Sequence, residues 1–474
     1  MATSRSHIRT HVTWIAMMDL ACLVLGAFVG VILRLGQEDA GLYVIANRQG
    51  LLLLFGGILV ANYLAGSYRL QYTFSRFNLV VTWLFSLFFA LLILGITSYA
   101  WMMETVIGRG VVGLTLAFYS LFSLTLKLLL YRSLFRSQIF QCRTVVLGAG
   151  ARAAGLRRIV ENDYVLPVHK VVANLRITDI ERDEPPADTV VDGIAVLNCT
   201  VANMDALIRS LGVTLIIVGL EDPDQASRLY PKLKRLRFEG VEVLSPLSVF
   251  EIYRGLTPLE FVNEEFLMQA NLESRLPLMR RMKRLIDLFV SLLALLLLLP
   301  VFVVIGLMLK ISAPRHPAFY TQIRVGQFGR RFRILKFRTM RREAEETTGP
   351  VWASTGDARI TPIGAVLRRF RLDEMPQFIN ILRGEMSMVG PRPERPEIIK
   401  ELEEQVPFFS EREMITPGLT GWAQIRYPYG STIEDARRKL EFDLYYIKHL
   451  SLSLDLQILL STLRIVMLGK ERTV

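Results

Sequence analysis

Residues 285–309 read LIDLFVSLLALLLLLPVFVVIGLML, an apolar run with one acidic side chain, Asp287, near its start. A transmembrane helix needs about 20 apolar residues, so length alone would let this run cross a bilayer. Pro300 lies well inside the run. A proline removes a backbone donor and clashes with the preceding turn of a helix. We therefore expect a bend at Pro300.

Basic residues flank this run on both sides. They are Arg280, Arg281, Lys283 and Arg284 before it, and Lys310, Arg315, Arg324, Arg330 and Arg331 after it. Because basic residues collect on the cytoplasmic side of membrane segments, we expect residues 285–309 to form a re-entrant helix hairpin that enters and leaves through the cytoplasmic leaflet. The alternative is a crossing helix, which would place the rest of the chain outside the cell.

Four other apolar runs precede this one, each near the length of a membrane span. They are Val12–Leu33, Leu51–Tyr68, Leu79–Trp101 and Val111–Leu130. They predict a four-helix transmembrane bundle within residues 1–140, and Asp19 and Lys127, near the ends of their runs, are expected to reach the interface. Arginines in alternate loops favour a cytoplasmic location for both ends of the bundle. The part of the chain that follows the bundle is then expected on the cytoplasmic side.

The chain changes character after Arg143. Short β-rich runs at 144–147, 168–173, 215–218 and 241–244 alternate with helical patterns. Such alternation indicates a parallel sheet, so residues 141–260 are expected to form a Rossmann-like α/β domain. Gly148-Ala149-Gly150 follows the first run as in a dinucleotide-binding loop, but Ala153 stands at the third glycine position. This incomplete pattern is weak evidence for a bound dinucleotide.

Composition narrows the classes of partner. The chain has 474 residues, a net charge of +12 and 51% hydrophobic residues. A basic balance fits nucleic acid or an anionic membrane surface, and the long apolar runs favour the membrane and argue against nucleic acid. Cys22, Cys142 and Cys199 have no paired spacing, so neither disulfides nor a zinc site are expected.

The last part of the chain carries a series of short polar motifs in a fixed order. An Asp-Glu pair or an arginine between prolines is weak evidence by itself, because acidic residues at helix starts are usually solvated. The series runs Lys283-Arg284-Leu285-Ile286-Asp287, Lys336-Phe337-Arg338-Thr339-Met340, Asp357-Ala358-Arg359, Leu367-Arg368-Arg369, Leu372-Asp373-Glu374-Met375-Pro376-Gln377, Gly384-Glu385-Met386-Ser387, Val389-Gly390-Pro391-Arg392-Pro393 and Pro417-Gly418-Leu419-Thr420-Gly421-Trp422.

Together these motifs resemble the catalytic domain of the large monotopic polyprenyl-phosphate phosphoglycosyl transferases, which are bacterial sugar transferases. The resemblance covers about Leu278 to the C-terminus. It implies an α/β catalytic domain at 275–474 that transfers a hexose-1-phosphate from a UDP-sugar to undecaprenyl phosphate and releases UMP. The stretches 391–396 and 427–430 look most like the exopolysaccharide branch associated with exosortase systems. A homodimer is also expected.

The resemblance also implies roles for individual residues. Asp373 would be the nucleophile that forms a covalent phosphosugar intermediate. Glu374 would hold Mg²⁺, a hard cation that prefers oxygen ligands and bridges phosphates. Substrate phosphates would be bound by the motif residues Arg368, Arg392, Lys336, Arg338, Pro391 and Pro393. Lys336 and Arg338 could equally be a basic patch on an edge strand.

Two other classes of function stay open. The Rossmann-like domain could make the chain a membrane-tethered, NAD-dependent sugar-nucleotide enzyme, which leaves the region around Asp373 unexplained. The chain could also be a non-catalytic scaffold of polysaccharide assembly. The scaffold hypothesis predicts that Asp373→Ala retains function.

Overall fold

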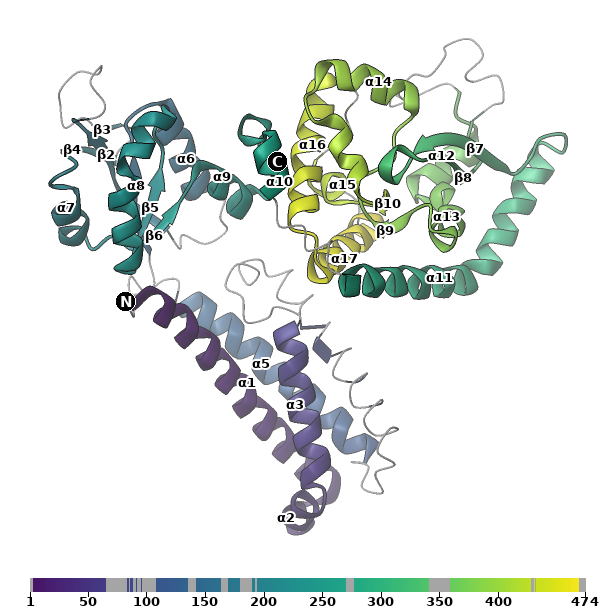
Figure 1. Cartoon of the computed structure of the whole chain (residues 1–474). Coiled ribbons are helices and arrows are strands. Elements are labelled where there is room, and N and C mark those ends of the chain that lie inside the picture. Colours follow the sequence, from purple (N-terminus) through teal and green to yellow (C-terminus); the bar gives the residue numbers. More distant parts are fainter. Residues whose placement is uncertain are drawn as a thin grey trace. The chain divides into compact units, whose positions relative to one another are not determined.

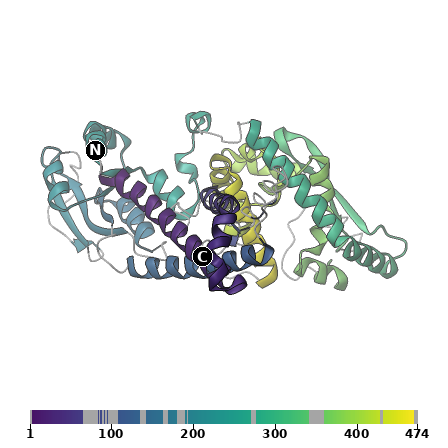
Figure 2. The same cartoon turned by 90° about the horizontal axis from the view of Figure 1, so that it is seen from below.

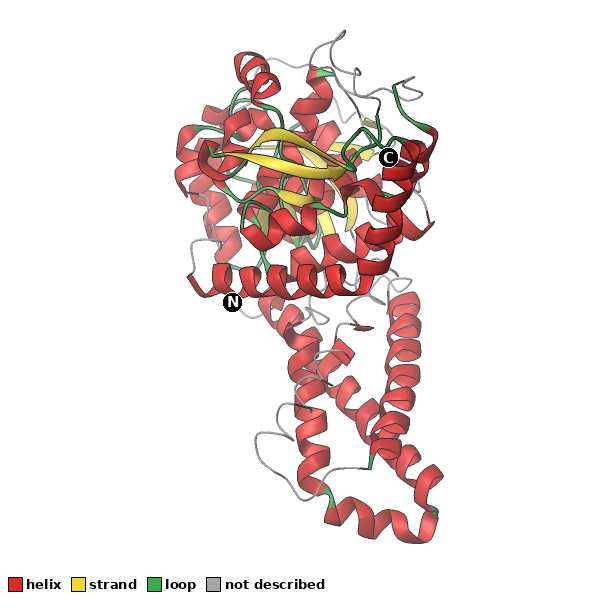
Figure 3. Cartoon of the chain, turned by 90° about the vertical axis from the view of Figure 1, so that its right-hand side faces the viewer, coloured by secondary structure: helices red, strands yellow, loops and turns green. Residues whose placement is uncertain are grey.

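The computed structural model describes residues 3–64, 108–134, 142–162, 169–179, 190–191, 194–269, 277–340, 359–427, 430 and 432–468, with six single residues between 83 and 95. The chain divides into two units, residues 1–254 and 255–474. Figure 1 shows both units, and Figure 3 distinguishes their helices, in red, from their strands, in yellow.

The described N-terminal helices are α1 (Thr3–Leu35), α2 (Gln37–Ala46), α3 (Arg48–Leu64) and α5 (Arg109–Leu134). By length and composition α1 and α5 could each cross a membrane, and α2 with α3 forms a pair bent by 78°. These helices match three of the four expected runs, and the run at 79–101 lies almost wholly outside the described residues. The short helix α2 was not expected from the sequence. Gly36, with a φ of 87°, permits the turn between α1 and α2.

Helices α1 and α5 pack closely because two glycines of α1 face α5 (Figures 1 and 2). A Cβ atom on Gly26 would lie 2.8 Å from the backbone nitrogen of Tyr119, and one on Gly30 would lie 3.0 Å from that of Thr115. Small residues four apart let two membrane helices approach at backbone distance, which maximises van der Waals contact where no hydrophobic effect drives association.

A buried polar cluster crosses the same bundle. The Nζ atom of Lys127 lies 2.8 Å from Oδ2 of Asp19, and both side chains are buried. The Ser123 hydroxyl donates to Asp19 Oδ1 at 2.6 Å, and Asn62 Nδ2 donates to Asp19 Oδ2 at 3.2 Å and to the Tyr119 hydroxyl at 2.9 Å. The expectation that Asp19 and Lys127 reach the interface separately is therefore wrong. They form a buried ion pair, because an unpaired charge inside a helix bundle is costly.

The α/β domain contains a six-stranded sheet in the order β3-β4-β2-β1-β5-β6. All adjacent pairs are parallel except β3 with β4. The expected strands are present, and β3 and β4 were not foreseen. The elements are β1 (Cys142–Leu147), α6 (Ala151–Asn162), β2 (His169–Ile177), β3 (Val190–Val191), β4 (Ile194–Cys199), α7 (Met204–Ser210), β5 (Leu215–Val218), α8 (Pro223–Phe238), β6 (Glu242–Leu244), α9 (Pro246–Val249) and η3 (Phe250–Arg254).

Helices cover both faces of this sheet. Val145 and Leu147 of β1 pack in a core with α7 and α8, whereas Val146 packs in a second core with α6 and α9. Successive residues of a strand point to opposite faces, so a run of apolar residues such as TVVL suits a strand that is buried on both sides. The result is a three-layer α/β/α domain.

The second unit begins at Gly255, and its first residues join its core. The backbone N–H of Thr257 donates to the carbonyl oxygen of Glu441 at 3.0 Å, and Leu259 packs beside Leu440. The sequence assigned 255–260 to the Rossmann-like domain. The helices of this unit are η4 (Leu259–Phe261), α10 (Glu264–Gln269), α11 (Pro277–Ser312), η6 (Gln327–Gly329), α12 (Pro362–Arg369), η8 (Leu372–Glu374), α13 (Gln377–Arg383), α14 (Pro396–Gln405), η9 (Phe409–Met414), α15 (Trp422–Arg426), α16 (Ile433–Lys448) and α17 (Leu452–Leu468).

Its strands form two small sheets. β7 (Phe319–Val325) pairs with β8 (Arg331–Phe337) in an antiparallel ribbon. β9 (Ser387–Val389) pairs with β10 (Gly418–Thr420) in parallel. Both sheets end close to the motif residues of this unit, so they position the candidate site.

Helix α11 contains the apolar run at 285–309. It is one continuous helix with Pro300 inside it, rather than two helices joined by a turn, and its ribbon changes direction in its later part (Figure 1). Its N-terminal part is fastened to the unit by Arg284, which donates to the carbonyl oxygen of Leu382 at 2.9 Å. Its C-terminal part is fastened by Leu309, which is buried beside Phe337 and whose carbonyl oxygen accepts from Arg338 at 2.9 Å. Both ends of α11 therefore contact the same unit.

Candidate active site

Asp373 and Glu374 lie in the short helix η8, between α12 and α13. Arg371 adopts the left-handed conformation with a φ of 54° and forms the turn that ends α12 and starts η8. Pro376 follows and precedes α13. This turn places two adjacent carboxylates in the interior, where both residues are buried.

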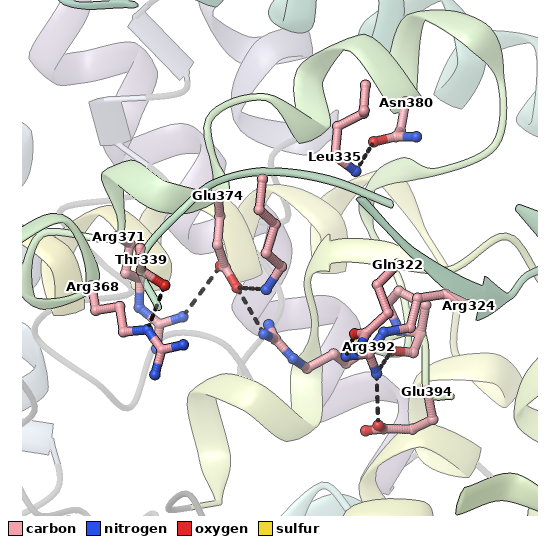
Figure 4. Close-up of polar contacts among 12 residues, drawn as sticks. Gln322, Arg324, Leu335, Thr339, Arg368, Arg371, Glu374, Asn380, Arg392 and Glu394 are labelled. Atoms are coloured by element: carbon pink, nitrogen blue, oxygen red, sulfur yellow. Dashed lines mark hydrogen bonds and ion pairs between the residues drawn. The ribbon is translucent and has the colours of Figure 1, made fainter. Parts of the chain in front are cut away.

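Three cations surround the carboxylate of Glu374 (Figure 4). Its Oε1 atom lies 2.7 Å from Arg392 and 3.2 Å from Lys336, and its Oε2 atom lies 3.7 Å from Arg371. Burial opposes ionisation of Glu374, but Arg392 and Lys336 outweigh it and hold the pKa of Glu374 well below its usual range. Glu374 is therefore an ionised carboxylate that gathers cations from three segments.

Asp373 is in a different state from its neighbour. No hydrogen bond or ion pair engages its carboxylate within the part of the chain that the structure describes. Burial and the charge of Glu374 raise its pKa, whereas Lys336, Arg368 and Arg392 oppose that rise. A desolvated carboxylate without hydrogen-bond partners is a stronger nucleophile than a solvated one, and nearby cations keep its ionised form accessible.

The other predicted site cations lie in two places. Lys336, on β8, faces Glu374, and burial lowers its pKa although Glu374 opposes the shift. Arg368 donates from Nε to the Thr339 hydroxyl at 3.0 Å and acts electrostatically on Asp373. The guanidinium of Arg338 instead donates to the carbonyl oxygen of Leu309 at the end of α11. The structure thus brings Lys336, Arg368 and Arg392 to the two carboxylates and ties Arg338 to the membrane helix.

The loop that presents Arg392 is held in place through its backbone carbonyl oxygens. Residues 391–394 accept one hydrogen bond at each carbonyl oxygen, between 2.8 and 3.2 Å, from Gly418 N, Arg412, Arg324 and Val325 N in that order. Pro391 and Pro393 have no N–H to satisfy and restrict the loop further. Arg392 is therefore presented to Glu374 from a pre-organised loop.

Comparison with known proteins shows the family of the second unit. Residues 278–469 match the family described as bacterial sugar transferase. A putative undecaprenyl-phosphate N-acetylgalactosaminyl 1-phosphate transferase of Bacillus subtilis is 44% identical over 130 residues, which are 27% of this chain and 72% of that protein. The exopolysaccharide production protein PSS of Rhizobium leguminosarum is 38% identical over 186 residues, which are 38% of this chain and 92% of that protein. The chain belongs to the bacterial sugar transferase family.

A longer similarity reaches beyond the catalytic part of this sugar transferase. The UDP-N-acetylgalactosamine-undecaprenyl-phosphate N-acetylgalactosaminephosphotransferase of Aeromonas hydrophila is 35% identical over 254 residues, which are 54% of this chain and 59% of that protein. The chain thus spans less than two thirds of that relative.

Two further residues position the site of the sugar transferase and were not foreseen. Asn380 is fully buried on α13; its Nδ2 donates to the carbonyl oxygen of Arg333 at 2.8 Å, and its Oδ1 accepts from Leu335 N at 3.0 Å. It thereby holds the edge of β8, the strand that carries Lys336. Arg412, the donor to the Arg392 carbonyl, pairs with the buried Asp443 at 2.8 Å. Burial raises the pKa of Asp443 to about 6, although Arg412 opposes the shift.

The sequence could have suggested only part of this second layer. Arg371 stands two residues from Asp373, between the motifs at 367–369 and 372–377, so its nearness to Glu374 had a local signal. Arg412 and Asp443 lie far apart in sequence and carry no motif that links them. Only the packing of η9 against α16 brings them together.

A divalent cation at this site would bind to carboxylate oxygens. No cluster of three or more His, Cys, Asp or Glu ligands occurs among the described residues. Mg²⁺ is usually bound by only one or two carboxylates together with water and substrate phosphates, so a larger cluster is not required. Among the residues that the structure describes, Oε1 of Glu374 contacts two cations, whereas Oε2 has only the 3.7 Å ion pair with Arg371. Glu374 Oε2 is therefore a carboxylate oxygen of the kind that Mg²⁺ takes from a protein, so Glu374 fits Mg²⁺ in the type of its donor.

Proposed function

We propose that this sugar transferase moves a hexose-1-phosphate from a UDP-sugar to undecaprenyl phosphate through a covalent intermediate on Asp373. The observation that carries the proposal is the contrast between the two adjacent carboxylates. Glu374 is neutralised by cations, whereas Asp373 is buried and its carboxylate has no hydrogen bond or ion pair with the residues that the structure describes. Relatives of this chain are named as enzymes that act on a UDP-sugar and undecaprenyl phosphate, which supports the same reaction class.

The proposed reaction has two balanced steps. An oxygen of Asp373 attacks the sugar-bearing phosphorus, a P–O bond forms, and the bond to the bridging oxygen breaks so that UMP leaves. An oxygen of undecaprenyl phosphate then attacks the same phosphorus and releases the carboxylate of Asp373. The product is a lipid diphosphate sugar, which would start exopolysaccharide assembly. Neither step needs an oxidant or an external proton carrier.

The cations of the site would stabilise the phosphate oxygens. Arg392 and Arg368 present planar guanidinium groups that match phosphate, and Lys336 adds a half-buried positive charge. Mg²⁺, held by Glu374, would add charge neutralisation for the diphosphate. Phosphoryl transfer depends mainly on such positioning and electrostatics.

Helix α11 would bring this chemistry to the lipid. Many of its large apolar side chains are exposed, including Phe289, Leu296, Leu297 and Ile311. Because both ends of α11 contact one unit, we propose that it enters and leaves the cytoplasmic leaflet of the inner membrane without crossing. The site would then lie at the bilayer surface, where a polyprenyl phosphate headgroup and a soluble nucleotide sugar can meet.

The experiment is a transfer assay combined with mass spectrometry. Purified protein receives a radiolabelled UDP-sugar, Mg²⁺ and undecaprenyl phosphate, and lipid-linked label and UMP are measured. Asp373→Asn is expected to lower both by at least about a thousandfold, as removal of a nucleophile does in other covalent enzymes. Glu401→Gln, on the exposed face of α14, makes the same charge change as a control and should retain activity.

The intermediate is tested directly. With the UDP-sugar alone, the peptide that contains Asp373 should gain the mass of one hexose phosphate in the unchanged protein and not in Asp373→Asn. Full transfer by Asp373→Asn would reject the nucleophile. Absence of transfer by the unchanged protein would instead favour the scaffold role.

A further inference from the structure

The Gly148-Ala149-Gly150 loop of the α/β domain is not used by the proposed transfer. It lies where the strand order of the sheet reverses. From β1 the chain builds outward to β2 and β4, then returns to β5 on the other side of β1. In open α/β sheets the ligand crevice lies at the carboxyl ends of the strands at this switch point. The crevice of this domain is therefore formed by the residues after β1 and after β5.

The two loops approach each other closely at this point. Gly219 N donates to the Leu147 carbonyl oxygen at 2.7 Å. Gly148 has a φ of 112°, and a Cβ atom on it would lie 3.0 Å from the Gly219 carbonyl oxygen. The glycines thus allow the chain after β1 and the chain after β5 to come into close contact.

The carboxylate of Glu221, from the loop after β5, occupies the mouth of this crevice. Its Oε1 atom accepts from the backbone N–H of Arg152, in the first turn of α6, at 3.3 Å. A Cβ atom on Gly150 would lie 2.6 Å from the same oxygen. Arg152 returns two hydrogen bonds, from its guanidinium to the carbonyl oxygens of Leu220 at 3.2 Å and Glu221 at 2.9 Å. Side chain and backbone together fasten Glu221 to the start of α6.

In dinucleotide-binding domains this position belongs to the ligand. The second glycine of the loop lets the backbone approach a pyrophosphate, which lies at the N-terminus of the following helix. Here Gly150, the second glycine, faces a carboxylate oxygen of the chain itself. A phosphate oxygen and a carboxylate oxygen make the same kind of hydrogen bond with a backbone N–H, and two anions at one helix start repel each other.

We propose that Glu221 occupies the pyrophosphate position of this Rossmann-like domain and closes the domain to nucleotides. The domain then acts as a structural module whose two central loops are joined by an internal anion. This inference concerns the α/β domain only, and it does not depend on the reaction of the second unit.

The test uses hydrogen–deuterium exchange of the full-length protein, with NAD⁺ and inorganic pyrophosphate as probes. Exchange is followed in peptides that contain residues 148–154, so that phosphate bound at the catalytic arginines does not enter the readout. The unchanged protein should show no probe-dependent protection there. Glu221→Ala and Glu221→Gln should gain protection by at least one probe, at concentrations at least about tenfold below any that affect the unchanged protein.

Controls separate charge and folding from the specific contact. Asp224→Asn removes one exposed negative charge nearby on α8 and should behave like the unchanged protein. Unaltered exchange in β1 and β5 without probe shows that a variant domain is folded, and Glu221→Gln preserves size if Glu221→Ala does not fold. Probe-dependent protection in the unchanged protein would overturn the proposal. Absence of protection in both folded Glu221 variants would overturn it as well.

Discussion

At the scale of single residues, adjacent carboxylates are given different chemistry by their surroundings. Glu374 has cations at both oxygens and stays ionised, whereas Asp373 is desolvated and has a raised pKa. Two adjacent residues of η8 thus differ in role: Glu374 binds cations, and Asp373 is the candidate nucleophile. This separation resembles other sites where two carboxylates take two roles according to environment.

The pH dependence of transfer should report the cations around Asp373. The nucleophile must be ionised, so activity falls as the pH drops through the pKa of Asp373. Arg368 lowers that pKa. We predict that Arg368→Gln raises it and shifts the acid limb of the kcat/KM profile to higher pH. We also predict a loss of about 10- to 100-fold in kcat/KM at neutral pH, the worth of a hydrogen bond to a charged group.

The neighbouring Arg369 supplies the control for this profile. It is exposed and lies over the Phe370 ring at 5.8 Å, so Arg369→Gln makes the same substitution away from the carboxylate. The profile of Arg369→Gln should stay with that of the unchanged enzyme. An acid limb that shifts equally in both variants would mean that general surface charge, and not the nearby charge of Arg368, sets it.

The sequence could predict these residues only as far as local motifs carry. Asp373, Glu374 and Arg392 stand in ordered motifs whose residue types suit phosphate chemistry. The division of labour between the two carboxylates depends on Lys336, 38 positions before Glu374, and on burial, neither of which spacing reveals. Glu221 carries no motif at all, and its contact with Arg152 depends on the strand order.

At the scale of elements, the loop at 391–394 shows how a flexible connection becomes rigid. Each of its carbonyl oxygens is bonded, and two of the donors are the guanidinium groups of Arg412 and Arg324. Arg324 also lies 3.2 Å from Glu394, and burial lowers its pKa although Glu394 opposes the shift. Such a loop needs little rearrangement when substrate binds.

Loosening this loop should lower the rate of the reaction. Arg324→Met keeps the length of the side chain and removes the hydrogen bond to the Pro393 carbonyl oxygen. We expect kcat/KM to fall by about 10- to 100-fold, because a misplacement of about 1 Å in a positioning group has effects of that size. Steady-state kinetics with a UDP-sugar measure this effect. Arg331→Met, at the exposed start of β8, should stay close to the unchanged enzyme.

The topology of α11 is predicted by its contacts. In a protein without Cys22, Cys142 and Cys199, single cysteines at Arg280 and Arg315 would lie on the two sides of the apolar run 285–309. Both should be protected from an impermeant thiol reagent in intact cells and labelled in inverted vesicles. Reaction of the two sites from opposite sides would show that α11 crosses the membrane. From the sequence the apolar run and its proline were clear, but the contacts that fasten both ends were not.

At the scale of the whole molecule, the chain combines a helical membrane part, an α/β domain and a catalytic unit. The polar cluster around Asp19 joins three helices of the first part, α1, α3 and α5. Asp19 and Lys127 are 108 positions apart, so their pairing could not be read from the separate apolar runs. An ion pair buried among helices fixes their register.

Breaking this pair should cost more than removing it. Asp19→Leu leaves Lys127 buried without its partner, and we expect a loss of about 3 kcal/mol in bundle stability. The double variant Asp19→Leu with Lys127→Leu should recover much of that loss, because neither charge is then left unpaired. Heat stability in detergent micelles measures both, with Glu38→Gln on exposed α2 as the control. Additive effects of the two single changes would contradict a direct pair.

The exposed hydrocarbon surface of α11 has a practical consequence for anyone who works with the enzyme. Removing residues 1–254 would delete the N-terminal membrane helices and leave this surface in place. A truncated catalytic unit should therefore still partition into detergent or a lipid nanodisc during purification, and should aggregate when the amphiphile is dialysed away. Solubility will not be gained by shortening the chain.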